Sequence, residues 1–448
     1  MILRQRWHWQ PLLLGGYLLL CAILALHLHL YPSQVQGADA LEYIDYALDM
    51  RADGFLGQIE PWRTYGYPWF IYICSLLFGT DRQTLTWGVV FVQATLYAAV
   101  VFSLAAQIVG RSRPLAQGIG IGLLLNPILV ALVMDTLTEG LTLITAVLLL
   151  TILLRAASVP RFASKLPWLI SGSILASFSM MIRPANLALL LAWNAAVFPV
   201  LLDSTIRLKL RALLVYAVIT AAISAIVWTP QLMISARQTG HASIFPAALG
   251  DFQIIMGLKL LKYATLVKAD HVVTGMFYPN PWLGKIPDTQ PWHWYFSHPA
   301  AGAITVASHV FNALNYDHPF VYIYEVSLPW SVPLAPICWA IYALAVLDVT
   351  AGISRRREFR VEHPEVVPVA LFLAVMTAVS LALISVSAVE SRFSTLIFAS
   401  ASVFACHCVL RIRGMSKPRR SRIVATSTIV AVVGMLTSEW MKTLSMPS

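Results

Sequence analysis

The chain has little charge for its length. Only 12% of its 448 residues are charged, whereas 58% are hydrophobic, and the mean hydropathy is +0.72. Soluble globular domains have about a quarter of charged residues, so the composition excludes that class. The formal net charge is +10 without any soluble basic patch, so no nucleic-acid partner is expected.

Cysteines and repeats are also scarce. The five cysteines show neither metal-ligand spacing nor a disulfide framework. Most lie in apolar runs, where they are expected to be small buried hydrophobic residues. The histidines match no zinc motif, so no metal site is predicted. Without internal repeats or low-complexity linkers, the sequence predicts one membrane domain over residues 1–448.

Long apolar runs are the main feature that is present. They lack the period-two alternation of a membrane barrel, and a helix needs about 20 apolar residues to cross a bilayer. The predicted fold class is therefore an all-α polytopic membrane protein. About eleven transmembrane helices are expected, the first as an uncleaved span rather than a signal peptide. They are 12–30, 86–109, 115–133, 138–154, 167–182, 185–202, 212–229, 330–350, 366–388, 393–410 and 423–441.

Lysine and arginine collect between alternate apolar runs, which predicts an orientation. Eleven spans with a cytoplasmic N-terminus place every basic cluster on the cytoplasmic side, as the positive-inside rule requires. Two short apolar pieces, 66–79 and 300–311, must then lie in the membrane interface. The opposite side receives a first external loop, 31–85, with juxtamembrane helices, and one larger external loop, 230–329.

Carboxylates follow the first span on the external side. In "GADALEYIDYALDM", residues 37–50, Asp39 and Glu42 are three apart and share one helix face with Tyr43. One hypothesis makes Asp39 a general base, because a neighbouring carboxylate raises one of the two pKa values towards neutral pH. The alternative is that these acids lie in the first turn of a surface helix and complement its dipole.

Two further external segments carry acids. Glu60 and Arg63 stand in "GQIEPWRTYGYP", where they form either a weak surface pair or part of a site. Asp135 and Glu139 are four apart at the mouth between the third and fourth spans. Charges there are costly unless they face a cavity, and helix capping is the alternative.

Cations complete the set on the same side. Arg183 ends the fifth span, Glu390 and Arg392 open the tenth, and Lys259 lies in the larger external loop. Arginine at a bilayer edge suits a lipid phosphate or pyrophosphate. The alternatives are an ion pair between Arg392 and Glu390 or another acid, and snorkelling of Arg183 to the interface.

Taken in order, these motifs resemble the GT-C glycosyltransferases, membrane enzymes that use polyprenyl-phosphate-linked sugars. The resemblance covers the N-terminal half well and the C-terminal half thinly, and its last motif is similar to the family's Glu-Arg-Tyr type. The matching segments are "GADALEYIDYA", "GYPWFIYICSLLFG", "DTLTEGL", "MMIRPANLALLL" and "VESRFST".

The resemblance implies a GT-C-like fold and a reaction. A sugar would pass, with inversion, from a polyprenyl-phosphate donor to a lipid, glycan or protein acceptor on the non-cytoplasmic face of a bacterial inner membrane. Asp39 would be the general base, with Glu42 and Glu60 as further catalytic candidates. This chain has Glu-Pro-Trp-Arg where the protein mannosyltransferases and lipid A aminoarabinose transferases have other patterns, which leaves the role of Glu60 open.

The resemblance also implies binding residues. Some relatives use a divalent cation near the first acids and others do not, so metal dependence stays open. Arg392, Arg183 and Lys259 are the candidate ligands of the donor phosphate. The candidate substrate-binding residues are Tyr43, Arg63, Tyr67, Asp135, Glu139 and Glu390.

Two other functions stay open. A transporter or flippase of lipid-linked saccharides would favour ionisable groups near mid-span and broken helices in related halves, and the collection of charge at one face counts against it. A polymerase or ligase of surface glycans would use an undecaprenyl-pyrophosphate-linked oligosaccharide rather than a monophosphate-linked sugar.

Overall fold

The structure is a bundle of long apolar helices. This computed structural model describes residues 9–30, 38–57, 62–202, 206–267, 273–283, 291–316, 322–324, 331–353, 366–412 and 414–445. Within them, ten helical segments are long and apolar enough to cross a membrane, which confirms a polytopic helical membrane protein. They correspond to α1 (Gln10–Leu30), α4 (Arg82–Ile108), α7 (Thr138–Ser158), α8 (Phe162–Ile182), α9 (Leu187–Leu201), α10 (Ile206–Thr239), α14 (Ser331–Ile353), α16 (Val366–Val386), α17 (Thr395–Ile412) and α18 (Lys417–Ser445).

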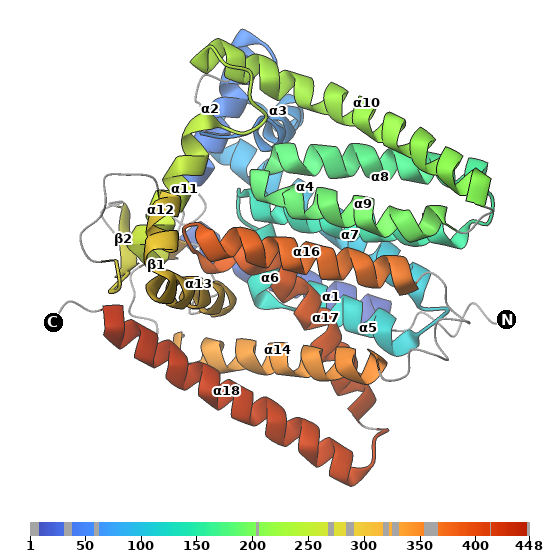
Figure 1. The fold of residues 1–448 in the computed structure, drawn as a ribbon, viewed down its shortest axis with the longest axis vertical. Coiled ribbons are helices and arrows are strands. Elements are labelled where there is room, and N and C mark those ends of the chain that lie inside the picture. Colours follow the sequence, from blue (N-terminus) through green and yellow to red (C-terminus); the bar gives the residue numbers. More distant parts are fainter. Residues whose placement is uncertain are drawn as a thin grey trace.

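The predicted span 115–133 is a bent pair of helices. α5 (Arg113–Leu124) and α6 (Pro127–Val133) meet at an angle of 59°. The break is written in the sequence: the Asn126 side chain accepts hydrogen bonds from Ile128 N and Leu129 N, and Pro127 occupies the first turn. α5 and α6 follow one another along the bundle in Figure 1, and counting them as one span gives the expected eleven.

The boundary predicted at Pro230 was wrong. The seventh predicted span, 212–229, ends just before Pro230, but α10 continues to Thr239, although proline lacks an N–H group and clashes with the preceding turn. The Tyr65 hydroxyl donates to Val227 O at 2.7 Å, and Gln231 Oε1 accepts from Tyr65 N at 3.0 Å. α10 is thus hydrogen-bonded to the segment before α3 on both sides of the proline.

The larger external loop contains a small sheet that the all-α prediction missed. Strand β1 pairs antiparallel with β2 and parallel with β3, in the order β2-β1-β3. Figure 1 shows β1, β2 and the neighbouring short helices together at the left end of the bundle. The elements are α11 (Ala247–Lys259), β1 (Leu260–Val267), β2 (Val273–Pro279), α12 (Pro291–Ser297), α13 (Pro299–Leu314) and β3 (Tyr322–Tyr324).

The first external loop contains the two expected juxtamembrane helices, α2 (Ala38–Asp53) and α3 (Gly66–Phe78). α3 has 13 residues, too few to cross a bilayer. It packs directly on the end of α8: a Cβ atom at Gly66 would lie 2.5 Å from the carbonyl carbon of Met181. Only glycine allows this approach, which fixes the start of α3 beside Arg183.

A buried polar cluster joins α14 and α17 near the opposite end of the bundle. Asp348 Oδ2 lies 2.6 Å from His407 Nδ1, and Asp348 Oδ1 lies 3.4 Å from Arg411 Nη1. The Asp348 side chain is 5% exposed. A carboxylate so deep in a membrane protein needs these partners.

Replacing Asp348 should destabilise the bundle. We expect Asp348→Ala to lower the free energy of unfolding on the order of 3 kcal/mol, because Arg411 loses a buried counter-charge. Thermal unfolding in detergent micelles measures the effect. Glu439→Ala, which breaks an exposed pair with Lys442, is the matched control and should change little. Equal losses of unfolding free energy in Asp348→Ala and Glu439→Ala would contradict a stabilising role for the Asp348 cluster.

Candidate active site

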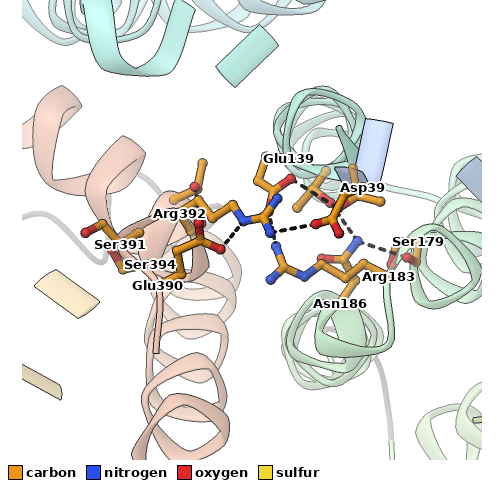
Figure 2. Close-up of polar contacts among 12 residues, drawn as sticks. Asp39, Glu139, Ser179, Arg183, Asn186, Glu390, Ser391, Arg392 and Ser394 are labelled. Atoms are coloured by element: carbon orange, nitrogen blue, oxygen red, sulfur yellow. Dashed lines mark hydrogen bonds and ion pairs between the residues drawn. The ribbon is translucent and has the colours of Figure 1, made fainter. Parts of the chain in front are cut away.

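Ionisable side chains from four elements converge at one end of the bundle. Asp39 lies in the first turn of α2 and Glu139 in the first turn of α7. Arg183 follows α8, and Arg392 lies in η4 (Ser391–Ser394), the short 3-10 helix before α17. Figure 2 shows Arg392 between Glu390 on one side and Asp39 and Glu139 on the other. Four ends that are remote in sequence therefore form one charged cluster.

Arg392 is the centre of this cluster. Its Nη2 atom donates to Asp39 Oδ2 at 2.8 Å, and its Nε atom donates to Glu390 Oε2 at 2.6 Å. Glu139 Oε1 lies 3.7 Å from the same Nε atom. The Arg392 side chain is only 10% exposed. The sequence-based alternative of an ion pair with Glu390 is confirmed, and two further acids share the guanidinium.

Glu139 holds the second arginine. Its Oε1 atom accepts from Arg183 Nη1 at 2.5 Å, and its side chain is 2% exposed. Asn186 fixes the turn that carries Arg183, because its N–H donates to Arg183 O at 2.9 Å and its amide donates to Ser179 O at 2.9 Å. Arg183 therefore points into the cluster, rather than snorkelling away from the protein as the alternative supposed.

Arg63 joins the acids of α2 to one another. Its Nη2 atom lies 2.7 Å from Asp39 Oδ1 and 3.0 Å from Glu42 Oε2. Its guanidinium carbon lies 5.2 Å from the centroid of the Tyr43 ring, within the range of a cation–π contact. The predicted shared face of α2 is thus confirmed, and a single arginine, Arg63, contacts both acids on it.

Aromatic rings line the cluster. The Phe393 ring centroid lies 4.4 Å from the guanidinium carbon of Arg183 and 5.7 Å from that of Arg392. Tyr43 and Tyr67 meet edge to face at 4.9 Å. Sequence reasoning missed Phe393, although it directly follows Arg392 in the quoted motif.

The last missed ring is Tyr263 of β1, 6.2 Å from the Phe393 ring. Its backbone N–H donates to Val389 O at 2.9 Å, so β1 is tied to the segment that carries Glu390. No sequence signal distinguished Tyr263 from the other aromatic residues of the loop, since the link depends on a contact across more than 120 residues of chain.

The carboxyl groups differ in their protonation. Burial raises the pKa of Asp39, but Arg392 and Arg63 outweigh it and bring that pKa down to about 2. Burial raises the pKa of Glu390 to about 7 in spite of Arg392, and it raises the pKa of Asp135 well above its ordinary value. The near-neutral carboxyl group that was expected at Asp39 beside Glu42 is found at Glu390 instead, whereas Asp39 is ionised throughout the physiological range.

Three buried oxygens at this end of the bundle have no hydrogen-bond partner within the described residues. They are Asp135 Oδ1, Thr136 Oγ1 and Glu390 Oε1. Buried polar atoms normally find partners, so these three are available to a ligand. Asp135 is connected to Tyr67 through Gln93, which accepts from the Tyr67 hydroxyl at 2.9 Å and donates to Asp135 O at 2.8 Å.

Two predicted residues do not join the cluster. Glu60 lies outside the described residues. Lys259 is exposed at the end of α11, and no ion pair connects it with the cluster in the described part of the chain. The same part contains no group of three acidic, histidine or cysteine side chains placed to share a metal ion. The acids face arginines instead, so these residues do not fit a divalent cation.

Comparisons with known proteins give no assignment. No protein-family model, curated protein or solved structure matches the chain. What the geometry offers chemically is an ionised, partly exposed carboxylate beside two arginines that are largely buried. Such a site can accept a proton at one position and hold an anionic group at an adjacent one.

Proposed function

We propose that the protein is a glycosyltransferase that moves a sugar from a polyprenyl-phosphate donor to an acceptor hydroxyl at the non-cytoplasmic edge of the membrane. The observation that carries the proposal is the position of Asp39. Its carboxylate is 24% exposed and contacts the buried Arg392. The candidate base and the candidate anion-binding residue are thus the two members of one ion pair. They lie in the region where a membrane lipid presents its phosphate.

The orientation rests on the distribution of charge. The order of the helices along the chain places the basic clusters near residues 111–113, 155–165 and 411–422 at one end of the bundle. The Arg392 cluster lies at the other end. The positive-inside rule assigns that end to the cytoplasm. The Arg392 cluster and the larger external loop then face away from it, in a bacterial inner membrane if the resemblance to GT-C enzymes holds.

The proposed reaction is a single in-line displacement. The Asp39 carboxylate accepts the proton of the acceptor hydroxyl while the oxygen of that hydroxyl bonds to the anomeric carbon of the sugar. The bond between that carbon and the phosphate oxygen breaks, and the phosphate leaves with the electron pair, which inverts the anomeric configuration. Arg392 and Arg183 neutralise the leaving phosphate, and Asp39 then returns the proton to water.

Transfer of radiolabelled sugar tests the proposal. Membranes containing the full chain are supplied with a panel of polyprenyl-phosphate sugars and with lipid, glycan and peptide acceptors. We expect one donor to give label in an acceptor with inverted stereochemistry. Transfer only from a pyrophosphate-linked oligosaccharide would favour a polymerase or ligase. If no donor supports transfer, translocation of the labelled lipid across vesicles tests the transporter instead.

A further inference from the structure

The charged cluster consists of two units with different supports. The first unit belongs to α2 and the segment before α3. Arg63 contacts Asp39 and Glu42, and it lies over the Tyr43 ring. Its three partners lie within five residues of one another on one helix face. Arg63 is therefore bound to one face of α2.

The second unit belongs to the ends of α7, α8 and α17. Arg183 pairs with Glu139, and Arg392 pairs with Glu390 from two residues earlier in the chain. Phe393 lies against both guanidinium groups. The Ser394 hydroxyl donates to Ala313 O at 2.6 Å, which anchors η4 to α13. The side chains of Glu139, Glu390 and Arg392 in this unit are 2%, 6% and 10% exposed.

The two units meet at the ion pair between Asp39 Oδ2 and Arg392 Nη2, at 2.8 Å. An anion that binds the planar Arg392 fork through two N–H groups needs a position now taken by a carboxylate. Glu390 and Glu139 are 6% and 2% exposed, whereas Asp39 is 24% exposed. Asp39 is therefore the carboxylate that an arriving anion can replace.

We propose that Arg63 is the positioning residue for Asp39, holding its carboxylate in place when the anionic group of the donor takes Arg392. The proposal rests on the proposed function and adds an order to it: the anionic ligand binds before Asp39 can act. Asp39 then has one counter-charge instead of two, which makes it a stronger base. The base thus gains strength only in the loaded site.

The charge balance at Asp39 includes groups from every element around it. Besides Arg63 and Arg392, the ionisable groups that interact with it electrostatically come from α2, the α6–α7 connection, β1 and the segment before η4. They are Tyr43, Asp135, Tyr263 and Glu390. None of these four side chains carries a positive charge, so Arg392 and Arg63 account for the low pKa of Asp39.

Binding of a lipid phosphate tests the exchange without any turnover. Polyprenyl monophosphate in detergent micelles is titrated into purified wild type and Asp39→Asn. The variant should bind at least about tenfold more tightly, because the competing carboxylate has lost its charge and close charge pairs are strongly coupled. Arg63→Gln should bind the lipid phosphate more weakly than wild type, because Asp39 has no counter-charge left once the anion takes Arg392. Equal or weaker binding by Asp39→Asn, or no binding by either protein, overturns the exchange.

The pH profile of transfer tests the role of Arg63. At saturating donor, the acidic limb of kcat/KM for the acceptor should move at least about one unit to higher pH in Arg63→Gln, since Asp39 loses its remaining cation. Arg63→Lys should restore the position of the limb. Arg82→Gln breaks an exposed pair between Arg82 of α4 and Asp45, which lies on α2 like Asp39. This variant should not move the acidic limb.

The two failures can be told apart. A limb that stays in place in Arg63→Gln makes Arg63 a structural residue and overturns the positioning role. If Asp39→Asn binds the lipid phosphate more tightly than wild type, as expected, but wild type transfers no sugar, the glycosyltransferase proposal is overturned. The exchange of Asp39 for an anion at Arg392 then still stands.

Discussion

Asp39→Asn should lower the rate of sugar transfer by about 10²–10⁴-fold, the range that general-base catalysis contributes. The amide keeps the shape of the side chain and its oxygen still accepts a hydrogen bond from an arginine, but it cannot accept a proton from a hydroxyl at neutral pH. The measurement is kcat at saturating donor and acceptor, with the folded fraction checked by thermal unfolding.

Asp45→Asn is the matched control for this loss. Asp45 lies on the same helix and pairs with an arginine, Arg82, at 2.5 Å, but both side chains are exposed. Its replacement should leave the rate close to wild type. Should Asp39→Asn retain full activity, Asp39 is only a first-turn acid of α2, and the base must be sought at Glu42, Glu60 or Glu139.

Arg392→Ala should be the most destabilising single change at the site. It removes the partner of Glu390 and one of the two arginine partners of Asp39, so the Glu390 carboxyl group is left without a counter-charge in a largely buried cluster. Breaking a buried ion pair from one side costs about 3–5 kcal/mol. Chemical or thermal unfolding in detergent micelles measures the difference from wild type.

The control for Arg392 comes from the same molecule. Arg82→Ala also breaks an arginine–carboxylate pair that links α2 to the bundle, but this pair is exposed, and its loss should change stability little. Arg392→Lys separates charge from geometry, since lysine keeps the charge but cannot bridge two acids with a planar fork. If Arg392→Ala unfolds at the temperature of Arg82→Ala, the cluster does not stabilise the bundle.

The spans and the polar face could be predicted because both depend on composition along the chain. Each of the eleven apolar runs has a matching helix or bent helix pair. Asp39, Glu139, Arg183 and Arg392 were all assigned to one side. Sidedness follows from counting crossings, so it needs no knowledge of how the helices pack.

The partners of these residues could not be predicted in the same way. Arg392 and Asp39 are 353 residues apart in sequence, and nothing local indicates which arginine meets which acid. The direction of the Asp39 pKa was wrong for the same reason, because the expectation counted the neighbouring acids of α2 and not two arginines from other segments. Pro230 shows a similar limit: the predicted span ends before this proline, but α10 continues through it to Thr239.

The arrangement of opposite charges around Arg392 affects the energy that a shift of charge requires in this cluster. In water, moving a negative charge requires solvent dipoles to turn, and that rotation makes up much of the barrier. Here the guanidinium groups of Arg183 and Arg392 are already fixed by Glu139, Glu390 and the Phe393 ring. The surroundings are oriented before any ligand arrives, so a shift of charge across this cluster meets a low reorganisation energy.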